Sequence, residues 1–250
     1  MRKHKKIGFY ILTLISAVFF GGISTFLFDV NNITHYALSL SMVQMSPLCG
    51  LLLLCLINKD FRCFKEMNLF SNISFKWILL SIGLPVIIIS SSSIILSKYG
   101  YPYIPNDYSP LSLTLVIFTS TIGCIGEELG WRGFLLPEFH KKYSLMSSSL
   151  FTGILWGAWH FGKISLYGLL GYLLFVIMIV EFSVLMAFIF KKTNKNMLLM
   201  ILFHLMINIS SIIMLSTREG LAFYIIACVI GAVLCTITII SNKETFLVKS

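Results

Sequence analysis

The stretch that decides the fold is LSLTLVIFTSTIGCIGEELGWRG, residues 111–133, in which an apolar run ends in a charged cluster. The run 111–124 is long enough to lie inside a bilayer, and Glu127, Glu128 and Arg132 follow it closely. Each such charge costs roughly 2.5–3.5 kcal/mol near the middle of a membrane span. Ionisable side chains at that depth typically mark a functional site, so we expect one here.

The composition indicates an all-α polytopic membrane protein. The chain has 250 residues, of which 57% are hydrophobic and 12% charged, whereas soluble domains have about 25% charged residues. One helical bundle accounts for the whole length, so 1–250 is expected to be a single transmembrane domain. The charged cluster and the polar residues that follow it place the functional core at 111–215.

Eight apolar runs predict a bundle of about eight transmembrane helices around a polar intramembrane cavity. The expected spans are 7–28, 36–57, 77–97, 111–136, 145–161, 165–190, 197–215 and 221–240. An even number of spans places both termini on one side of the membrane. The loops on that side carry the excess of Lys and Arg, which predicts that both termini are cytoplasmic.

The formal net charge of +9 does not indicate a nucleic-acid partner. The basic residues stand between the apolar runs, where membrane topology requires them, and they form no stripe with interleaved aromatic residues. The six cysteines include no CxxC pair. We therefore interpret them as small buried hydrophobic residues, in preference to disulfides or thiolate metal ligands.

Few ionisable side chains fall well inside the expected spans. The acidic ones are Glu127, Glu128 and Glu181, and the only histidines are His160 and His204.

On a helix, Glu128 and Arg132 are four residues apart and share one face, which predicts an ion pair that compensates its own burial. Glu127 points about a quarter-turn away and has no expected local partner. A carboxylate in such a setting suits a general base.

Two further pairs of residues lie on single helix faces. Trp156 and His160 are four apart in the fifth span, and His204 and Asn208 are four apart in the seventh. Taken alone, His160 is typical of a histidine in a helical core, and the pair of His204 and Asn208 indicates an interhelical hydrogen bond. Together with Glu127 they predict one shared cavity in which a carboxylate and a histidine activate water.

The same residues leave the use of a metal open. Glu127, His160 and His204 could ligate a divalent ion such as zinc that activates a bound water. However, the pattern is not HExxH, and no two histidines are four residues apart. Either a metal-assisted or a metal-free hydrolysis is compatible with the pattern.

Three motifs together resemble one known family. They are EExxxR at 127–132, WxxxH at 156–160 and HxxxN at 204–208. This order within membrane spans is similar to that of the CAAX protease and bacteriocin-processing (CPBP, or Abi) family of intramembrane proteases. The family usually carries Phe where this chain has Trp156, and the aromatic character is kept. The resemblance implies an eight-helix intramembrane endopeptidase, similar to the CAAX prenyl proteases, and leaves a metalloendopeptidase mechanism open.

The resemblance also implies roles for individual side chains. The implied site residues are Glu127, Glu128, Arg132, His160, His204 and Asn208. Glu127 and His160 would activate the attacking water, and His204 and Asn208 would stabilise the oxyanion. Glu128 and Arg132 would support these four residues. The implied substrate is a membrane-associated protein or peptide in a bacterial cell membrane, with bacteriocin self-immunity or peptide maturation as implied settings.

Two other functional classes fit some of the same residues. A transporter or proton relay would also place Glu and His inside the membrane, and Glu181 suits that role best. Against it, the chain shows no paired repeat halves. A catalytically silent immunity or binding protein would keep the fold, but loss of the polar set would then be expected, and here the set is complete.

Overall fold

The computed structural model describes residues 5–29, 32–71, 73–101, 109–214 and 220–247 as a bundle of helices. The helices are α1 (Lys5–Leu27), α2 (Ile33–Gln44), α3 (Ser46–Asn58), α4 (Arg62–Lys65), α5 (Phe75–Lys98), α6 (Pro110–Gly130), the π-helix η2 (Trp131–Leu135), α7 (Leu136–His140), α8 (Leu145–Trp159), the 3-10 turn η3 (Phe161–Lys163), α9 (Ile164–Lys192), α10 (Met197–Met214), α11 (Leu221–Ser241) and α12 (Lys243–Leu247).

The structure confirms a polytopic helical membrane fold. Among the described residues, six helical segments are long and apolar enough to span a bilayer: Lys5–Leu27, His35–Asn58, Phe75–Lys98, Pro110–His140, Phe161–Lys192 and Leu221–Ser241. The expected spans at 145–161 and 197–215 form shorter helices, α8 with 15 residues and α10 with 18. α8 ends at Trp159, so His160 lies just after this helix and not inside it. The turn between the fifth and sixth expected spans begins at Phe161.

The expected second span is interrupted near its middle. α2 ends at Gln44, Met45 caps the next helix, and α3 starts at Ser46 with Pro47 in its first turn. Because proline has no N–H and its ring crowds the preceding turn, a helix breaks or bends before it. A Cβ on Gly130 of α6 would stand 2.5 Å from Cβ of Pro47, so the break packs directly against α6.

The expected sixth span also contains a break. α9 covers Ile164–Lys192, but Gly168 has φ 66° and ψ 173°, outside the helical region. A left-handed φ suits glycine because it has no Cβ. The first turn of α9 therefore changes direction before the long membrane-spanning part begins.

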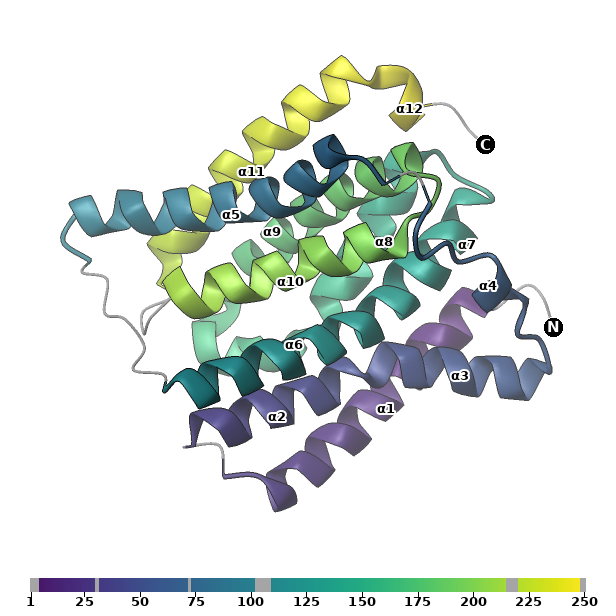
Figure 1. The fold of residues 1–250 in the computed structure, drawn as a ribbon, viewed down its shortest axis with the longest axis horizontal. Coiled ribbons are helices and arrows are strands. Elements are labelled where there is room, and N and C mark those ends of the chain that lie inside the picture. The colour runs from purple at the N-terminus through teal and green to yellow at the C-terminus, as the bar shows by residue number, and fades with distance from the viewer. Residues whose placement is uncertain (1–4, 30–31, 72, 102–108, 215–219, 248–250) are drawn as a thin grey trace.

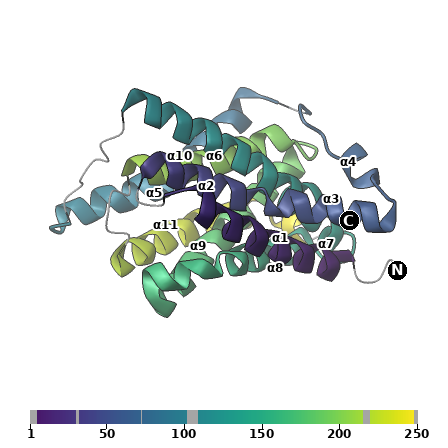
Figure 2. The same ribbon diagram turned by 90° about the horizontal axis from the view of Figure 1, so that it is seen from below.

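The helices form layers around α6 and α10, which lie side by side in the middle of the bundle (Figure 1). In the view from below, α1, α2 and α3 form the nearest layer, with α6 on one side of them and α8 and α9 on the other (Figure 2). α1 packs on α3, α2 on α6, α8 on α9, and α10 on α5. The charged motif at the end of α6 is thus enclosed by helices from both halves of the chain.

Small residues bring α8 and α9 close together. A Cβ on Gly153 would lie 2.8 Å from the backbone Cα of Val180, and Ser183 Oγ donates to the carbonyl of Ser149 across the same contact at 2.9 Å. Close approach through small residues is the usual way in which membrane helices associate. This contact fixes the end of α8, and therefore His160, relative to the core.

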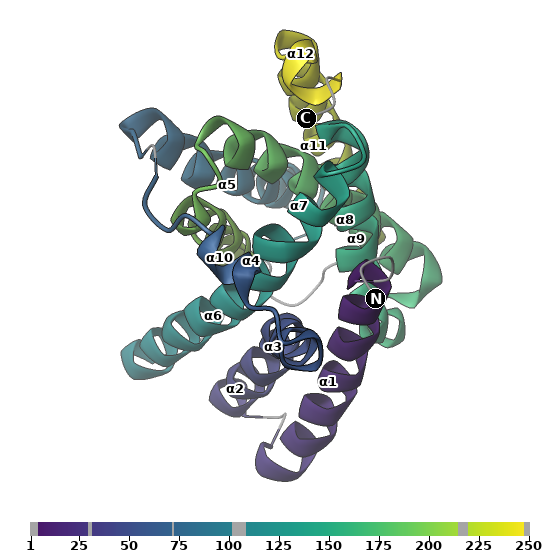
Figure 3. The same ribbon diagram turned by 90° about the vertical axis from the view of Figure 1, so that its right-hand side faces the viewer.

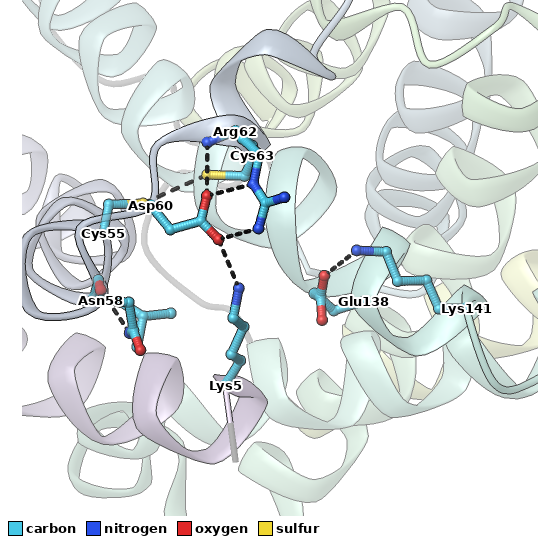
Figure 4. Close-up of polar contacts among 9 residues, drawn as sticks. Lys5, Cys55, Asn58, Asp60, Arg62, Cys63, Glu138 and Lys141 are labelled. Carbon is cyan, nitrogen blue, oxygen red and sulfur yellow. Dashed lines mark hydrogen bonds and ion pairs between the residues drawn. The ribbon is translucent and has the colours of Figure 1, made fainter. Parts of the chain in front are cut away.

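One end of the bundle holds the start of α1, together with the short helices α4, α7 and α12 (Figure 3). At this end Asp60 accepts from Arg62 at 2.9 Å and from Lys5 of α1 at 3.1 Å (Figure 4). These hydrogen bonds, first those of Arg62 and then that of Lys5, hold the pKa of Asp60 well below its usual range. The cluster connects α1 to the loop after α3.

Candidate functional site

The charged motif lies where α6 ends and a wider helical turn begins. α6 ends at Gly130, and residues Trp131–Leu135 form one turn of π-helix before α7. Such turns are rare and occur frequently at functional sites. Glu127, Glu128 and Arg132 are all 0% exposed, so the motif is fully enclosed by the bundle.

Glu128 is at the centre of a three-member hydrogen-bonded network. Its Oε1 accepts from Nη1 of Arg132 at 3.0 Å, which is the ion pair predicted from the spacing. The same oxygen accepts from Nδ1 of His204 at 2.8 Å. Because a carboxylate can only accept, the proton of that contact sits on Nδ1, and Nε2 of His204 is directed elsewhere.

Glu127 has more partners than the sequence predicts. Its Oε2 accepts from the indole Nε1 of Trp131 at 3.3 Å and from that of Trp156 at 2.6 Å. The expectation that Glu127 lacks a local partner is therefore wrong, because Trp131 stands four residues after it on the same helix face. The Arg132 guanidinium lies 4.1 Å from the centre of the Trp156 ring, so one indole serves both charged groups.

The second carboxylate oxygen of Glu127 faces a histidine. Its Oε1 lies 3.9 Å from Nε2 of His204. That distance is too long for a direct hydrogen bond. A small polar group between the two atoms would contact both, which makes this gap the natural place for a reacting oxygen.

His160 stands at the junction of α8 and η3. Its Nδ1 donates to the carbonyl of Trp156 at 2.9 Å, which leaves the lone pair of the neutral ring on Nε2. The rings of Trp159 and Phe175 hold it edge-to-face, with centroids 4.6 and 5.1 Å away. A histidine fixed in this way can accept a proton from the cavity.

Asn208 lies one turn beyond His204 on α10. Its Nδ2 donates to Sγ of Cys124 on α6 at 3.3 Å. Sulfur is a weak acceptor, so this amide can readily donate to a stronger one.

A cavity of about 680 Å³ joins these side chains. Its lining includes Trp156, His160, His204 and Asn208, and it extends past Tyr36. The cavity runs toward the end of α1, the start of α2, the end of α10 and the start of α11. It therefore opens at the end of the bundle opposite to the Lys5–Asp60–Arg62 cluster.

Glu181, the third expected intramembrane acid, is placed elsewhere. It lies on α9 with its carboxyl against α11, where a Cβ on Gly231 would stand 2.1 Å from Oε2. Within the described part of the chain, that oxygen has no hydrogen-bond partner. Glu181 does not line the cavity that holds the two histidines.

The structure gives roles to residues that the motifs did not assign. Trp131 lies outside the motif pattern and donates to Glu127, which the i+4 spacing could have indicated; Trp156 belongs to a motif, but its role as a donor was not predicted. A further residue is Gln44, at the end of α2, which lines the cavity and lies near the carboxyl of Glu127. Gln44 comes from the N-terminal half, for which the sequence offered no functional signal.

The three residues considered as metal ligands do not form a metal site in this arrangement. Among the described residues, no three His, Cys, Asp or Glu side chains are placed to hold one ion. Nδ1 of His160 donates to a carbonyl and Nδ1 of His204 donates to Glu128, which leaves the Nε2 atom of each ring available.

Comparisons with known proteins point to one family. Residues 109–210 match the family model "Type II CAAX prenyl endopeptidase Rce1-like". The chain is also 28% identical over 131 residues to "CAAX prenyl protease 2" of Methanococcus maripaludis, a match that covers 46% of this chain and 48% of that protein. The chain thus spans about half the length of this curated relative. The matched segment contains all three motifs and begins after α5.

Proposed function

We propose that the chain is an intramembrane endopeptidase, because residues 109–210 match the family model "Type II CAAX prenyl endopeptidase Rce1-like". Its substrate would be a membrane-associated protein or peptide, and it would hydrolyse a peptide bond with a water activated by Glu127 and His160. The observation that carries the proposal is the enclosed pair of Glu127 Oε1 and His204 Nε2, 3.9 Å apart beside a cavity inside a membrane bundle.

In the proposed reaction, Glu127 acts as the general base. Two indole donors hold Oε2, so Oε1 remains for the water. The water oxygen attacks the carbonyl carbon while its proton passes to the carboxylate, and Nε2 of His160 accepts the second hydrogen bond of the water. The proton then moves to the leaving nitrogen as the carbon–nitrogen bond breaks.

Two residues of α10 would stabilise the developing charge. Within the described residues, Asn208 donates only to a sulfur, so its amide can turn to the tetrahedral oxyanion. His204 is fixed through Nδ1 to Glu128 and, when protonated on both nitrogens, donates from Nε2. Donors held in place before the reaction stabilise such a charge most effectively.

Glu128 and Arg132 would support this arrangement without taking part in proton transfer. Their ion pair offsets the charge of each partner inside the bundle and positions His204.

A prenylated or otherwise lipid-anchored chain fits an apolar cavity that reaches the bilayer. Bacteriocin self-immunity and peptide maturation in a bacterial membrane are the settings we propose.

We further propose that both termini are cytoplasmic, because the loops at their end of the bundle carry the excess of basic residues. The start of α1 and α12 lie at that same end (Figure 3). The cavity would then open toward the non-cytoplasmic half of the membrane.

The test is cleavage of two quenched fluorescent probes by the purified full chain in lipid nanodiscs. One probe is a farnesylated peptide that ends in a CAAX sequence, and the other is a peptide with a single transmembrane helix. We expect wild-type protein to cleave at least one probe, and Glu127→Ala, His160→Ala and His204→Ala to abolish cleavage. Addition of a chelator to the active protein tests whether a metal is used.

Glu181→Ala is the matched control, because it removes an intramembrane carboxyl that lies outside the cavity. It should cleave at the wild-type rate. Cleavage retained by all three site variants, or no cleavage of either probe by the wild type, would contradict the proposal. Loss of activity in Glu181→Ala alone would favour a proton relay.

A further inference from the structure

Gln44 is the only glutamine in the chain, and it stands at an unusual place. It is the last residue of α2, directly before the break at Met45 in the middle of the span His35–Asn58. It lies outside the segment 109–210 that matches the protease family. Even so, its side chain lines the same cavity as His160 and His204.

The break between α2 and α3 packs against α6 through glycines, and this contact places Gln44. A Cβ on Gly123 would stand 2.2 Å from Oε1 of Gln44, and one on Gly126 would stand 2.9 Å from Cα of Met45. Any larger residue at these positions would move the break away from α6. The missing side chains therefore allow the amide of Gln44 to reach the level of Glu127, one turn along the same helix.

A second contact anchors the break to the other side of the site. Ser46 Oγ accepts from the indole Nε1 of Trp159 at 3.2 Å. Trp159 in turn packs edge-to-face on the ring of His160, with centroids 4.6 Å apart. The residues 44–46 thus contact both the helix that carries the carboxylate and the helix that carries the histidine.

The side chain of Gln44 lies close enough to the Glu127 carboxyl to act on its charge, and Oε1 of Glu127 has no hydrogen-bond partner among the described residues. The two donors to Glu127 are indoles that both approach Oε2, from α8 and from the π-turn. An amide that arrives from α2 approaches the carboxyl from a separate helix. Donation from this amide to Oε1 would add a third donor from a third element and leave the carboxylate little freedom to rotate.

We infer that Gln44 is a positioning residue for the catalytic carboxylate, so that the N-terminal helices complete the active site that residues 109–210 carry. This inference rests on the proposed function. Gln44 acts through Glu127: it fixes the direction of Oε1 toward His204 and the water. Its loss should slow the chemical step and leave substrate binding almost unchanged, because small misplacements of reacting groups strongly reduce rates.

The test compares Gln44→Leu and Gln44→Glu with wild-type full chain in the same nanodisc cleavage assay. We expect Gln44→Leu to lower kcat by about 10- to 100-fold with KM near the wild-type value. Gln44→Glu keeps the shape but can donate only when its carboxyl is protonated. Its activity relative to Gln44→Leu should therefore rise as the pH is lowered from 8 to 5.5, which a packing role would not produce.

Thr121→Ala is the matched control, because its hydroxyl donates to the carbonyl of Ile117 within α6 and its side chain does not line the cavity. It should keep wild-type kcat. Wild-type kcat in Gln44→Leu, or a loss that appears in KM alone, would overturn the inference. So would an equal loss in both Gln44 variants at every pH.

A readout without cleavage separates this inference from the proposed function. The infrared carboxyl band of Glu127 is assigned by its disappearance in Glu127→Gln, and it should shift in Gln44→Leu but not in Thr121→Ala. A shifted band in protein that cleaves no probe would keep the Gln44–Glu127 contact and reject only the protease. An unshifted band would reject the contact itself.

Discussion

Trp156 combines three tasks in one side chain. Its indole N–H donates to Glu127, its ring face lies 4.1 Å from the Arg132 guanidinium, and its ring edge meets His204 with centroids 5.1 Å apart. A phenylalanine at this position could keep the two ring contacts but not the hydrogen bond.

Trp156→Phe should therefore separate the ring from the donor. A hydrogen bond to a charged group contributes about 1.5–3 kcal/mol, so we expect kcat to fall by about 10- to 100-fold with unchanged folding. The measurement is kcat and KM in the nanodisc assay, together with the thermal midpoint. The control is Trp77→Phe, because Trp77 packs on Phe188 away from the cavity. Equal activity of the Trp156→Phe and Trp77→Phe variants would contradict the role of the Trp156 donor.

The Glu128–Arg132 pair is expected to act on stability as well as on activity. Removing one partner of a buried pair leaves the other charge uncompensated and costs about 3–5 kcal/mol. Glu128→Gln should therefore lower the thermal midpoint strongly. The double variant Glu128→Gln, Arg132→Met should recover much of the stability but not the cleavage activity, and a double variant no more stable than the single one would contradict this account.

At the scale of helices, the close contact of α8 with α9 sets the position of His160. Gly153→Ala would bring a Cβ to 2.8 Å from the backbone of Val180, which cannot move aside as a flexible side chain would. Overpacking of this kind costs about 1–3 kcal/mol. We expect a lower thermal midpoint and a reduced cleavage rate.

Gly83→Ala is the matched control for this prediction. It lies inside α5, where a Cβ would meet nothing within 4 Å. Alanine favours a helix over glycine by roughly 0.5–1 kcal/mol, so this variant should be as stable as the wild type or slightly more so. A Gly153→Ala protein with the same midpoint as Gly83→Ala would show that α8 can shift freely.

The elements were predictable from sequence to the extent that their signals are local. The apolar runs predict the membrane helices, and the spacing of Glu128 and Arg132 predicts their ion pair, which the structure contains. The break at Met45 has a local signal in Pro47, but the long apolar run around it concealed the break. Trp156 and Gln44 approach Glu127 from other helices, and no spacing within one segment can indicate such a contact.

At the scale of the whole molecule, the Lys5–Asp60–Arg62 cluster ties the first helix to the loop after α3. Because the folded pKa of Asp60 lies below its unfolded value of 3.8, its contribution to stability is fully present above that value and is lost as the pH falls through the folded pKa. The difference in thermal midpoint between wild type and Asp60→Asn should be constant from pH 8 to 5 and shrink below about pH 4. A difference that grows toward low pH would contradict the assignment.

The direction of the cavity gives a second prediction at this scale. Gly21 and Gly22 line the cavity, and a Cβ on either meets nothing within 4 Å, so cysteines there should be tolerated. In intact cells, Gly22→Cys should react with a membrane-impermeant maleimide from outside, whereas Lys191→Cys should react only after permeabilisation. The wild type, with its six native cysteines, gives the background. The reverse pattern would place the cavity toward the cytoplasm.

The cavity reaches the outside of the bundle between apolar side chains. Val18, Leu40 and Leu166 line it and are at the same time 66%, 46% and 65% exposed, on α1, α2 and α9. A lipid-anchored substrate can therefore arrive by lateral diffusion within the bilayer. The search becomes two-dimensional, and turnover should depend on the number of substrate molecules per lipid. Adding empty lipid at fixed amounts of protein and substrate should slow the reaction, although the concentrations in the tube stay the same.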